Sequence, residues 1–272
     1  MKQRRSPITS VVMIGLACLV GVPLYYIVVN TLKTQEEMTQ SPLALPSKLF
    51  LGNYQQIFET VPLGRSFVNT LIVTVVAILV MLFVGSTAAY AMAMRASRFN
   101  RFFGALLLLG FIVPGQSTLI PLYRMLVDVE LVDTLRGLVV IYTGGAIFCY
   151  FLIQGYISRL PFEIIEAARI DGAGPFQIYW RIVLPLIRPI LATVGVFQTM
   201  WIWNDFITPS VFLSSPEKAT LVLQVYRSVG EFSTDWPGFM TMSVLVLVPM
   251  VVFFILTQRH IVDGLLAGSV KS

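Results

Sequence analysis

The sequence is poor in charged residues. Asp, Glu, Lys and Arg make up 12% of its 272 residues, whereas about 25% is usual in a soluble domain. This shortage argues against a soluble enzyme, a disordered chain and a protein that binds nucleic acid. Hydrophobic residues instead reach 56% of the chain. Because so large an apolar fraction is expected when much of the surface faces lipid, we predict an integral protein of the lipid bilayer.

Residues that carry catalytic or metal chemistry are also scarce. The two cysteines, Cys18 and Cys149, lie in apolar runs and suggest neither a disulfide framework nor a thiolate metal site. The single histidine, His260, follows Arg259 and has no second histidine to form a cluster with. No G-x-x-x-x-G-K-[ST] phosphate loop occurs. We therefore expect no enzyme and no metal site here, and if the chain does energised work, the energy must come from another polypeptide or an ion gradient.

Six stretches are long and apolar enough to cross a bilayer, which takes about 20 residues in a helix. They are residues 8–30, 66–94, 102–122, 137–157, 186–213 and 239–258. Basic residues precede the first stretch, as they do in a signal peptide. Its apolar run, however, is longer than the roughly 7–15 residues of a signal peptide and lacks a small-residue cleavage site. We expect a retained anchor and six transmembrane helices.

The distribution of Lys and Arg predicts the orientation of these spans. With the N-terminus inside, the cytoplasmic segments hold twelve basic residues and the outer segments seven. The connection at residues 95–101 alone carries three arginines. Because basic segments tend to remain in the cytoplasm, we expect both termini inside.

Small residues and prolines within the spans predict how the helices pack and where they break. Gly85, Ala89 and Ala93 recur every four residues, which would let a neighbouring helix approach closely. In the third span, Pro114 and Pro121 are each expected to interrupt the helix. At Pro114 two interpretations stay open: a kink that lines the transport path, or a helix end with the following residues in the outer interface.

Asp205 is the acidic residue enclosed by the predicted fifth span. An ionisable side chain at membrane depth costs at least about 2.5 kcal/mol, so it should face a cavity or a partner. The neighbouring Trp201, Trp203 and Asn204 offer rings and polar atoms that would suit a sugar. The alternative is a structural hydrogen bond or a helix cap between subunits.

The predicted cytoplasmic loop at residues 158–189 holds a short helix. Pro161 fits its first turn, and Glu163 and Glu166 lie on one face near its positive N-terminal end. Gly172 and Gly174 follow, and a glycine can adopt the left-handed conformation that ends a helix. We interpret this helix as a docking element for a cytoplasmic partner.

The spacing in this loop resembles the EAA motif of ABC importer permeases. The matching residues are Glu166, Ala167, Ala168, Gly172, Ile182, Leu184 and Pro185. Other segments resemble the carbohydrate branch of that family, in particular the six-span maltose-type permease. They are residues 88–93, Pro114 with residues 121–123, residues 203–205 and residues 258–271. The sequence departs from the family at Ser269 and Ser272, where the tail usually has Ala and Gly.

The resemblance implies an all-α protein with six transmembrane helices in the type I ABC importer (MetI-like) fold, with both termini in the cytoplasm and the chain in the inner membrane. Its parts would be an anchor helix with the first outer loop (1–65), a core (66–260) and a cytoplasmic tail (261–272). Its partners would be a second, homologous permease, two copies of a cytoplasmic ATPase that bind ATP and Mg, and an extracytoplasmic sugar-binding protein. The chain itself would need no cofactor.

The resemblance also implies roles for particular residues, with Glu166 as a polar contact to the ATPase and Gly172 as a hinge. The residues expected to couple the chain to the ATPase are Glu163, Glu166, Ala167, Ala168, Asp171, Gly172, Leu184 and Pro185. Those expected along the substrate path are Pro114, Trp201, Trp203, Asn204 and Asp205. The last outer loop, residues 214–238, would approach the binding protein.

The substrate is the least determined part of this prediction. We expect a neutral di- or oligosaccharide, and the alternative is a sugar-like solute such as glycerol phosphate. A secondary transporter without an ATPase is a further alternative. It would call for carboxylates that bind a coupling ion or for an inverted repeat, and the spans contain one Asp and no convincing repeat.

Overall fold

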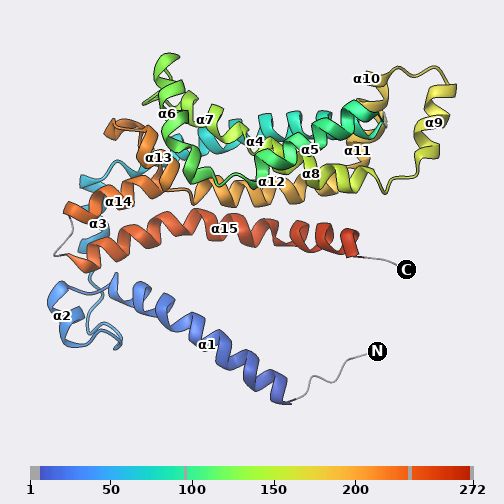
Figure 1. Ribbon diagram of the computed structural model, residues 1–272. Coiled ribbons are helices and arrows are strands. Elements are labelled where there is room, and N and C mark those ends of the chain that lie inside the picture. Colours follow the sequence, from blue (N-terminus) through green and yellow to red (C-terminus); the bar gives the residue numbers. More distant parts are fainter. Residues whose placement is uncertain (1–6, 95–96, 232–234, 270–272) are drawn as a thin grey trace. The chain divides into compact units, whose positions relative to one another are not determined.

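Helices form every regular element in the part of the chain that the structure describes. The computed structural model describes residues 7–94, 97–231 and 235–269 (Figure 1). Arg95 of the basic connection, the side chain of His260, the side chains of the predicted tail and residues 270–272 lie outside this description. The predicted all-α fold is confirmed.

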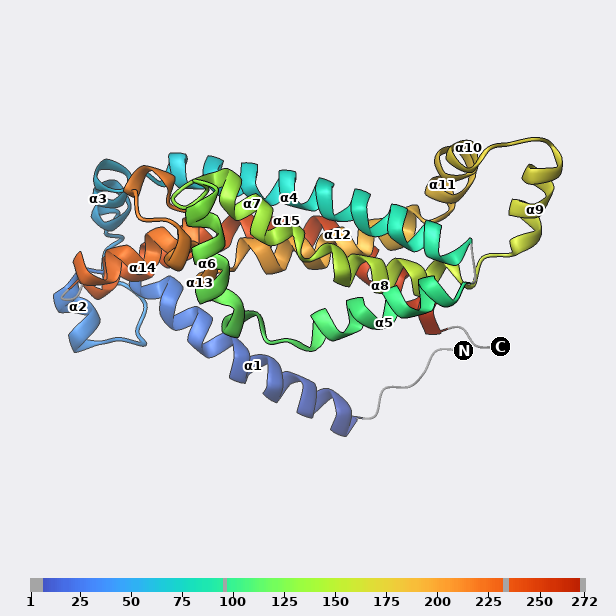
Figure 2. The same ribbon diagram turned by 45° about the horizontal axis from the view of Figure 1, so that its top comes forward.

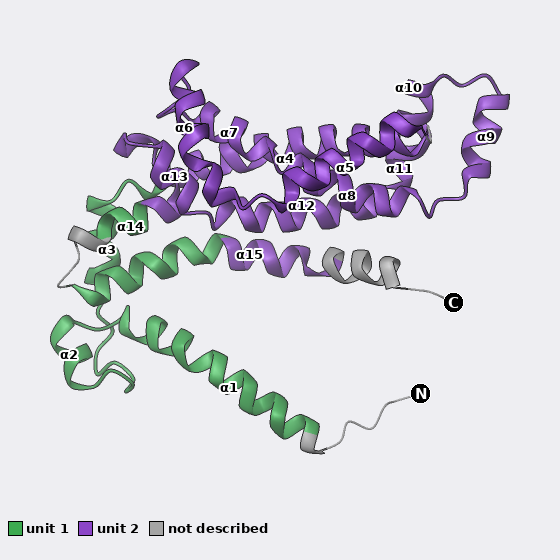
Figure 3. Ribbon diagram, viewed as in Figure 1, with its two compact units in different colours: residues 1–64, 224–249 green, residues 65–223, 250–272 purple. Residues whose placement is uncertain are grey.

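The chain divides into two compact units (Figure 3). Unit 1 comprises residues 1–64 and 224–249, and unit 2 comprises residues 65–223 and 250–272. The prediction of an anchor segment, a core and a tail, with boundaries at residues 65 and 260, stays a prediction.

Four helical segments are long and apolar enough to cross a membrane. They are Thr9–Asn30 within α1 (Pro7–Asn30), Leu63–Ala93 (α4), Leu135–Ile157, and Trp236–Arg259 within α15 (Trp236–Ser269). The third of these consists of α7 (Leu135–Thr143) and α8 (Ala146–Ile157), with a short break at two glycines. Two further pairs of helices qualify if each bent pair is counted as one span, which gives up to six.

The first bent pair replaces the predicted third span. Helix α5 (Arg98–Ile112) ends just before Pro114, the 3-10 helix η1 (Gly115–Thr118) follows, and α6 (Leu119–Asp128) leaves at 90°. Val113 is extended, as a residue before proline should be. The helix therefore ends before Pro114, while the placement of the following residues in the outer interface and the role of Pro114 along the transport path stay predictions. The break predicted at Pro121 is wrong, because Pro121 lies in the first turn of α6, where a proline is tolerated.

The second bent pair replaces the predicted fifth span. The chain passes through α10 (Pro175–Ile178), a π-helix η2 (Tyr179–Val183) and α11 (Leu184–Leu186), and then bends by 72° into α12 (Arg188–Trp203). The span was predicted to continue to residue 213, but α12 ends at Trp203 and a separate helix, α13 (Ile207–Phe212), follows. Asp205 thus lies between two helices, where its carboxylate accepts a backbone hydrogen bond that competes with helix continuation.

The core of unit 2 forms where α4, α8 and α12 pack together, as Figure 2 shows. Gly85 of α4 lies directly against α8: a Cβ atom on Gly85 would be 2.6 Å from Cys149 Cβ and 3.0 Å from the Tyr150 backbone nitrogen. The predicted close approach of a helix to this small-residue stripe is confirmed, and Ala89 on the same face is fully buried. Unit 2 also contains η3 (Pro216–Lys218), between α13 and α14.

Unit 1 holds α1, the first outer loop with α2 (Gln35–Gln40) and α3 (Gly52–Thr60), and parts of α14 (Leu221–Glu231) and α15. The loop is fastened by buried polar groups. Lys33 is fully buried and its Nζ donates to the Ser41 carbonyl at 2.7 Å, while the Asn53 amide donates to the Thr31 and Lys33 carbonyls. These bonds hold an irregular segment next to α1 without a large apolar core of its own.

Candidate coupling loop and transport path

A short exposed helix lies at one end of unit 2. Helix α9 (Phe162–Ile170) begins one residue after Pro161 and has Glu163 in its first turn, close to the predicted arrangement. In Figure 1 it stands apart from the long helices of its unit and is joined to them by extended segments. Such a helix has most of its surface available to another molecule.

The two faces of α9 differ in exposure. Ile165 and Ala168 are buried in the core cluster of unit 2. Glu163, Glu166 and Ala167 are exposed on the remaining surface. The acidic side chains and one small side chain are therefore presented outward, while Ile165 and Ala168 anchor the helix.

The turn after α9 depends on one glycine. Gly172 has φ of +82°, the left-handed conformation that the sequence predicts for a helix end. The Ala173 N–H donates to the Ala168 carbonyl at 2.9 Å and closes the end of the helix. Gly174 has φ of −72°, so it does not share this conformation. Asp171 and Gly172 are exposed, and the predicted motif residues Leu184 and Pro185 lie half-buried in and beside the core.

Two of the predicted path residues, Trp201 and Asp205, contact the same tyrosine. Trp201 is 55% exposed and its ring meets Tyr142 edge to face, with centroids 5.7 Å apart. Tyr142 donates a hydrogen bond of 2.9 Å to Asp205 Oδ2, and Asp205 Oδ1 accepts from the Thr208 N–H at 3.3 Å. Trp201 and Asp205 are therefore brought together through Tyr142.

The other predicted path residues are not part of this group. Trp203 is 7% exposed and packs edge to face against Phe67 of α4. Asn204 is exposed and its amide caps α12 by donating to the Met200 carbonyl at 2.7 Å. Pro114 is exposed at the bend between α5 and α6. Trp203 thus has the environment of a packing residue.

Two residues of this region escape prediction from the sequence. Tyr142 looks like one more aromatic residue in an apolar run, and its bond to Asp205 joins residues 63 positions apart. Gln198 of α12 is buried, and its amide donates to the Gly145 carbonyl at 3.2 Å. This bond satisfies backbone at the break between α7 and α8. The Gly144-Gly145 pair was the available signal for that break, because paired glycines weaken a helix.

On the predicted outer side of unit 2, one carboxylate joins two loops. Asp133 accepts hydrogen bonds from the Ser214 and Ser215 N–H groups at 3.0 Å and from the Ser215 hydroxyl, and it forms an ion pair of 2.9 Å with Lys218. Partial burial would by itself raise the pKa of Asp133. The hydrogen bonds from Ser215, Lys218 and Ser214 outweigh it and hold that pKa well below its usual range.

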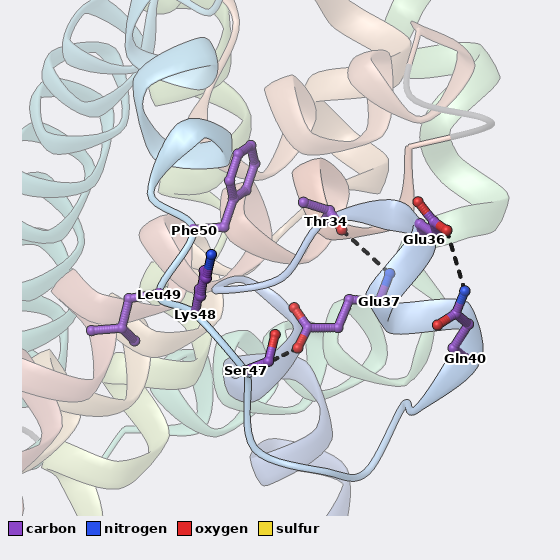
Figure 4. A pocket seen from close by; sticks show the side chains of 8 residues that line it. All are labelled: Thr34, Glu36, Glu37, Gln40, Ser47, Lys48, Leu49 and Phe50. Atoms are coloured by element: carbon purple, nitrogen blue, oxygen red, sulfur yellow. Dashed lines mark hydrogen bonds between the residues drawn. The ribbon is translucent and has the colours of Figure 1, made fainter.

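The first outer loop in unit 1 carries a shallow hollow (Figure 4). Its lining is mixed, polar and apolar, and comprises Thr34, Glu36, Glu37, Gln40, Ser47, Lys48, Leu49 and Phe50. The Ser47 N–H donates to Glu37 Oε1 at 2.6 Å, and this backbone hydrogen bond lowers the pKa of the Glu37 carboxyl. The bond ties both ends of the loop together.

These features define a class of protein. The chain has several helices apolar enough to cross a membrane, and the break in one of them is bonded to the buried amide of Gln198. A short exposed helix, α9, lies on a loop. Together these are the parts of a multi-pass membrane permease. Residues 81–266 match the model of the family described as binding-protein-dependent transport system inner membrane component, which is more than half of the chain. The chain belongs to this family of permease subunits.

Individual relatives agree with this assignment. The chain is 35% identical over 250 residues to the probable starch degradation products transport system permease protein AmyC of Thermoanaerobacterium thermosulfurigenes, covering 92% of this chain and 91% of that protein. It is also 35% identical over 257 residues to the melibiose/raffinose/stachyose import permease protein MelC of Bacillus subtilis, covering 94% and 93%.

A solved structure is similar over nearly the whole chain. It is the crystal structure of a bacterial ABC transporter involved in the import of the acidic polysaccharide alginate, with a TM-score of 0.81 and 24% identity over 93% of this chain and 95% of the other. This likeness confirms the predicted importer permease fold. The chain is thus a multi-pass, non-catalytic membrane component.

Proposed function

We propose that this chain is one of two permease subunits in an ATP-driven importer that takes up an oligosaccharide. A second, homologous permease would complete the path across the inner membrane, and both termini of this chain would lie in the cytoplasm. An extracytoplasmic binding protein would deliver the solute to the outer loops, among them residues 214–238. The family match and the substrates in the names of the relatives support this proposal.

Energy would enter through the loop at residues 158–189. Two copies of a cytoplasmic ATPase would bind ATP and Mg, and one of them would receive α9 in a cleft. Glu166 would be the polar contact, with Ala167 allowing close approach and Gly172 forming the hinge. ATP-driven closure would then move α9 and switch the path between its inward-facing and outward-facing states.

The observation that carries the proposal is the construction of α9. One face is anchored by Ile165 and Ala168, while Glu163, Glu166 and Ala167 point outward on a helix closed by a left-handed glycine. Because Ile165 and Ala168 fix which side of the helix faces the core, Glu166 is held on the outward side, where it is available for a contact with a partner.

Replacement of Glu166 tests this role. In membranes that contain the whole complex, Glu166→Ala should leave insertion of the chain intact but release the ATPase or uncouple ATP hydrolysis from import. Asp128→Ala, at an exposed acidic residue near the end of α6, is the matched control. Normal coupled import by Glu166→Ala would remove the basis of the proposed contact.

The substrate would be a neutral di- or oligosaccharide. Trp201 offers an exposed ring beside Tyr142 and Asp205. An aromatic face with neighbouring hydrogen-bonding groups suits the apolar faces and hydroxyls of a sugar. The substrate class is tested by measuring the uptake of labelled raffinose, maltose and glycerol phosphate by the reconstituted complex, and the competition of each with the others. Preferential uptake of glycerol phosphate would favour the alternative of a phosphorylated solute.

A further inference from the structure

The segment that follows α9 is fastened to α4 by two tyrosines. Tyr179 of η2 and Ser86 of α4 share a hydrogen bond of 2.8 Å between their hydroxyl groups. One turn further along α4, the Tyr90 hydroxyl donates to the Pro175 carbonyl at 3.0 Å. The rings of Tyr90 and Tyr179 also contact each other, with centroids 5.4 Å apart. These contacts join the start of the α10–η2 segment to a single turn of α4.

The contacts lie in a protected site. Ser86, Tyr179 and Tyr90 are 1%, 3% and 9% exposed. The Ser86 hydroxyl is also within hydrogen-bond distance of the Leu82 carbonyl, so it can donate to that carbonyl while accepting from Tyr179. A buried network with every member satisfied is strong, because leaving one polar group unpaired there costs its full desolvation penalty.

These contacts lie where they can link the movement of α9 to α4. They lie between α9 on one side and the 72° bend before α12 on the other. Tyr179 is also the first residue of a π-helix, an element that is rare and frequently found at functional sites. A displacement of α9 would reach α4 through the tyrosine contacts, in addition to the contact of Arg169 on α9 with Met94 just after α4, whereas the bend could absorb part of it before α12.

We infer that Ser86, Tyr90 and Tyr179 form a clamp that makes α4 move together with the coupling loop. These are positioning residues, because all three are buried and act through their contacts with one another. The inference rests on the proposed function, because it assumes that α9 is the element that the ATPase moves. It adds the route by which that movement enters the membrane.

The variant Tyr179→Phe tests the clamp, since it removes one hydroxyl group and keeps the ring. The readout is the amount of solute imported per ATP hydrolysed by the complete complex in proteoliposomes with binding protein. We expect this ratio to fall about fivefold, the factor that corresponds to one net hydrogen bond of about 1 kcal/mol, while the complex still assembles and hydrolyses ATP. Loss of packing alone would reduce assembly rather than the ratio.

Tyr156→Phe is the matched control, because Tyr156 lies on α8 and its hydroxyl makes no hydrogen bond within the described residues. Ser86→Ala should lower the ratio to a similar extent as Tyr179→Phe, and the double variant should be no worse than the more severe single one. If the Tyr179→Phe complex does not assemble, the same ratio of solute imported to ATP hydrolysed is measured for Tyr90→Phe, which loses the hydrogen bond to Pro175. A lower ratio would support the clamp, and an unchanged ratio would refute it.

Two results separate the clamp from the proposed function. A wild-type complex that imports solute without ATP would refute the proposed function. A wild-type complex that requires ATP, together with a Tyr179→Phe complex of unchanged ratio or with additive losses in the double variant, would refute the clamp alone.

Discussion

Asp133 concentrates several interactions of the outer loops in one side chain. It bonds to the backbone of Ser214 and Ser215 and pairs with Lys218, while its own N–H donates to the Phe212 carbonyl at 2.8 Å. Asp133 also has a φ of +56°, which few residues other than Asn, Asp and Gly accept. One carboxylate thus holds the start of the last outer loop in place.

Asp133→Asn should lower the thermal stability of the purified chain. The amide keeps one acceptor but loses the charge that pairs with Lys218, and solvent at the site limits the cost to about 1 kcal/mol. Thermal unfolding in detergent measures the change. Asp128→Asn serves as the control, because Asp128 is an exposed acidic residue. Equal melting temperatures for both variants would contradict the assigned role.

The same carboxylate predicts a pH dependence. Because folding lowers the pKa of Asp133, its stabilising effect is present above the unfolded pKa of about 4 and is lost as the pH falls below that value towards the lower folded pKa. The stability difference between the wild type and Asp133→Asn should therefore be constant between pH 8 and about pH 5 and shrink at more acidic pH. A difference that grows on acidification would contradict this prediction.

Replacement of Trp203 should mainly lower stability, whereas replacement of Trp201 should mainly lower import. Trp203→Ala removes a buried ring and should destabilise the chain by about 3–5 kcal/mol. Trp201→Ala removes an exposed ring and should reduce import about tenfold, equivalent to roughly 1.4 kcal/mol, with a smaller effect on stability. Uptake and thermal unfolding of both variants, measured side by side, check this. Unchanged import by Trp201→Ala would contradict a role of Trp201 in the substrate path and leave it a packing or partner contact.

Prediction of single residues from the sequence succeeded where local chemistry decides. The left-handed Gly172 and the first-turn Glu163 follow from the needs of helix ends. The partner of Asp205 could not be predicted, since it is Tyr142, on another helix. Likewise, the sequence did not distinguish the exposed Trp201 from the buried Trp203, because that depends on which helices pack around α12.

At the scale of elements, the turn after α9 has a strict backbone requirement. No described atom lies within 4 Å of a Cβ placed on Gly172 or Gly174, so space does not limit either position. Gly172→Ala forces a left-handed alanine and should cost about 1–2 kcal/mol, whereas Gly174→Ala should be nearly neutral. We expect weaker coupling of ATP hydrolysis to import in the first variant and normal coupling in the second. Equal behaviour of the two would contradict the hinge role of Gly172.

The contact between α4 and α8 makes a second prediction at this scale. Gly85→Val would place side-chain atoms against the backbone of α8, where even a Cβ lies 3.0 Å from the Tyr150 nitrogen. We expect a loss of about 1–3 kcal/mol from the forced separation. Gly155→Ala, on α8 but with no described atom within 4 Å of its Cβ, should be neutral or slightly stabilising. Thermal unfolding of the two variants distinguishes them, and a neutral Gly85→Val would contradict the close packing.

Element boundaries were predictable when a proline fixed them and less so elsewhere. Val113 could not continue a helix before Pro114, so the end of α5 follows from the sequence. The end of α12 does not, because the apolar run continues beyond Trp203 to residue 213. There the Asn204 amide caps the end of α12, and Asp205 accepts a hydrogen bond from the Thr208 N–H at the start of α13. Hydropathy does not register this local competition for backbone hydrogen bonds.

At the scale of the whole molecule, apolar composition and the motif in the cytoplasmic loop were enough to predict a multi-pass importer permease, which the family match confirms. Side chains such as Ile170 and Phe176 in the loop region are more than 80% exposed. Large apolar groups in that state are expected where another subunit binds. A contact with another subunit depends on that subunit's sequence as well, so the sequence of this chain alone does not predict it.

The most direct test of the proposed role is import by a defined complex. The tagged chain is purified in mild detergent with the subunits that accompany it, reconstituted into liposomes, and supplied with binding protein and labelled raffinose or maltose. We predict that a second permease and an ATPase co-purify, and that uptake requires both ATP and the binding protein. A chain that purifies alone and moves the sugar into liposomes without ATP would contradict the account.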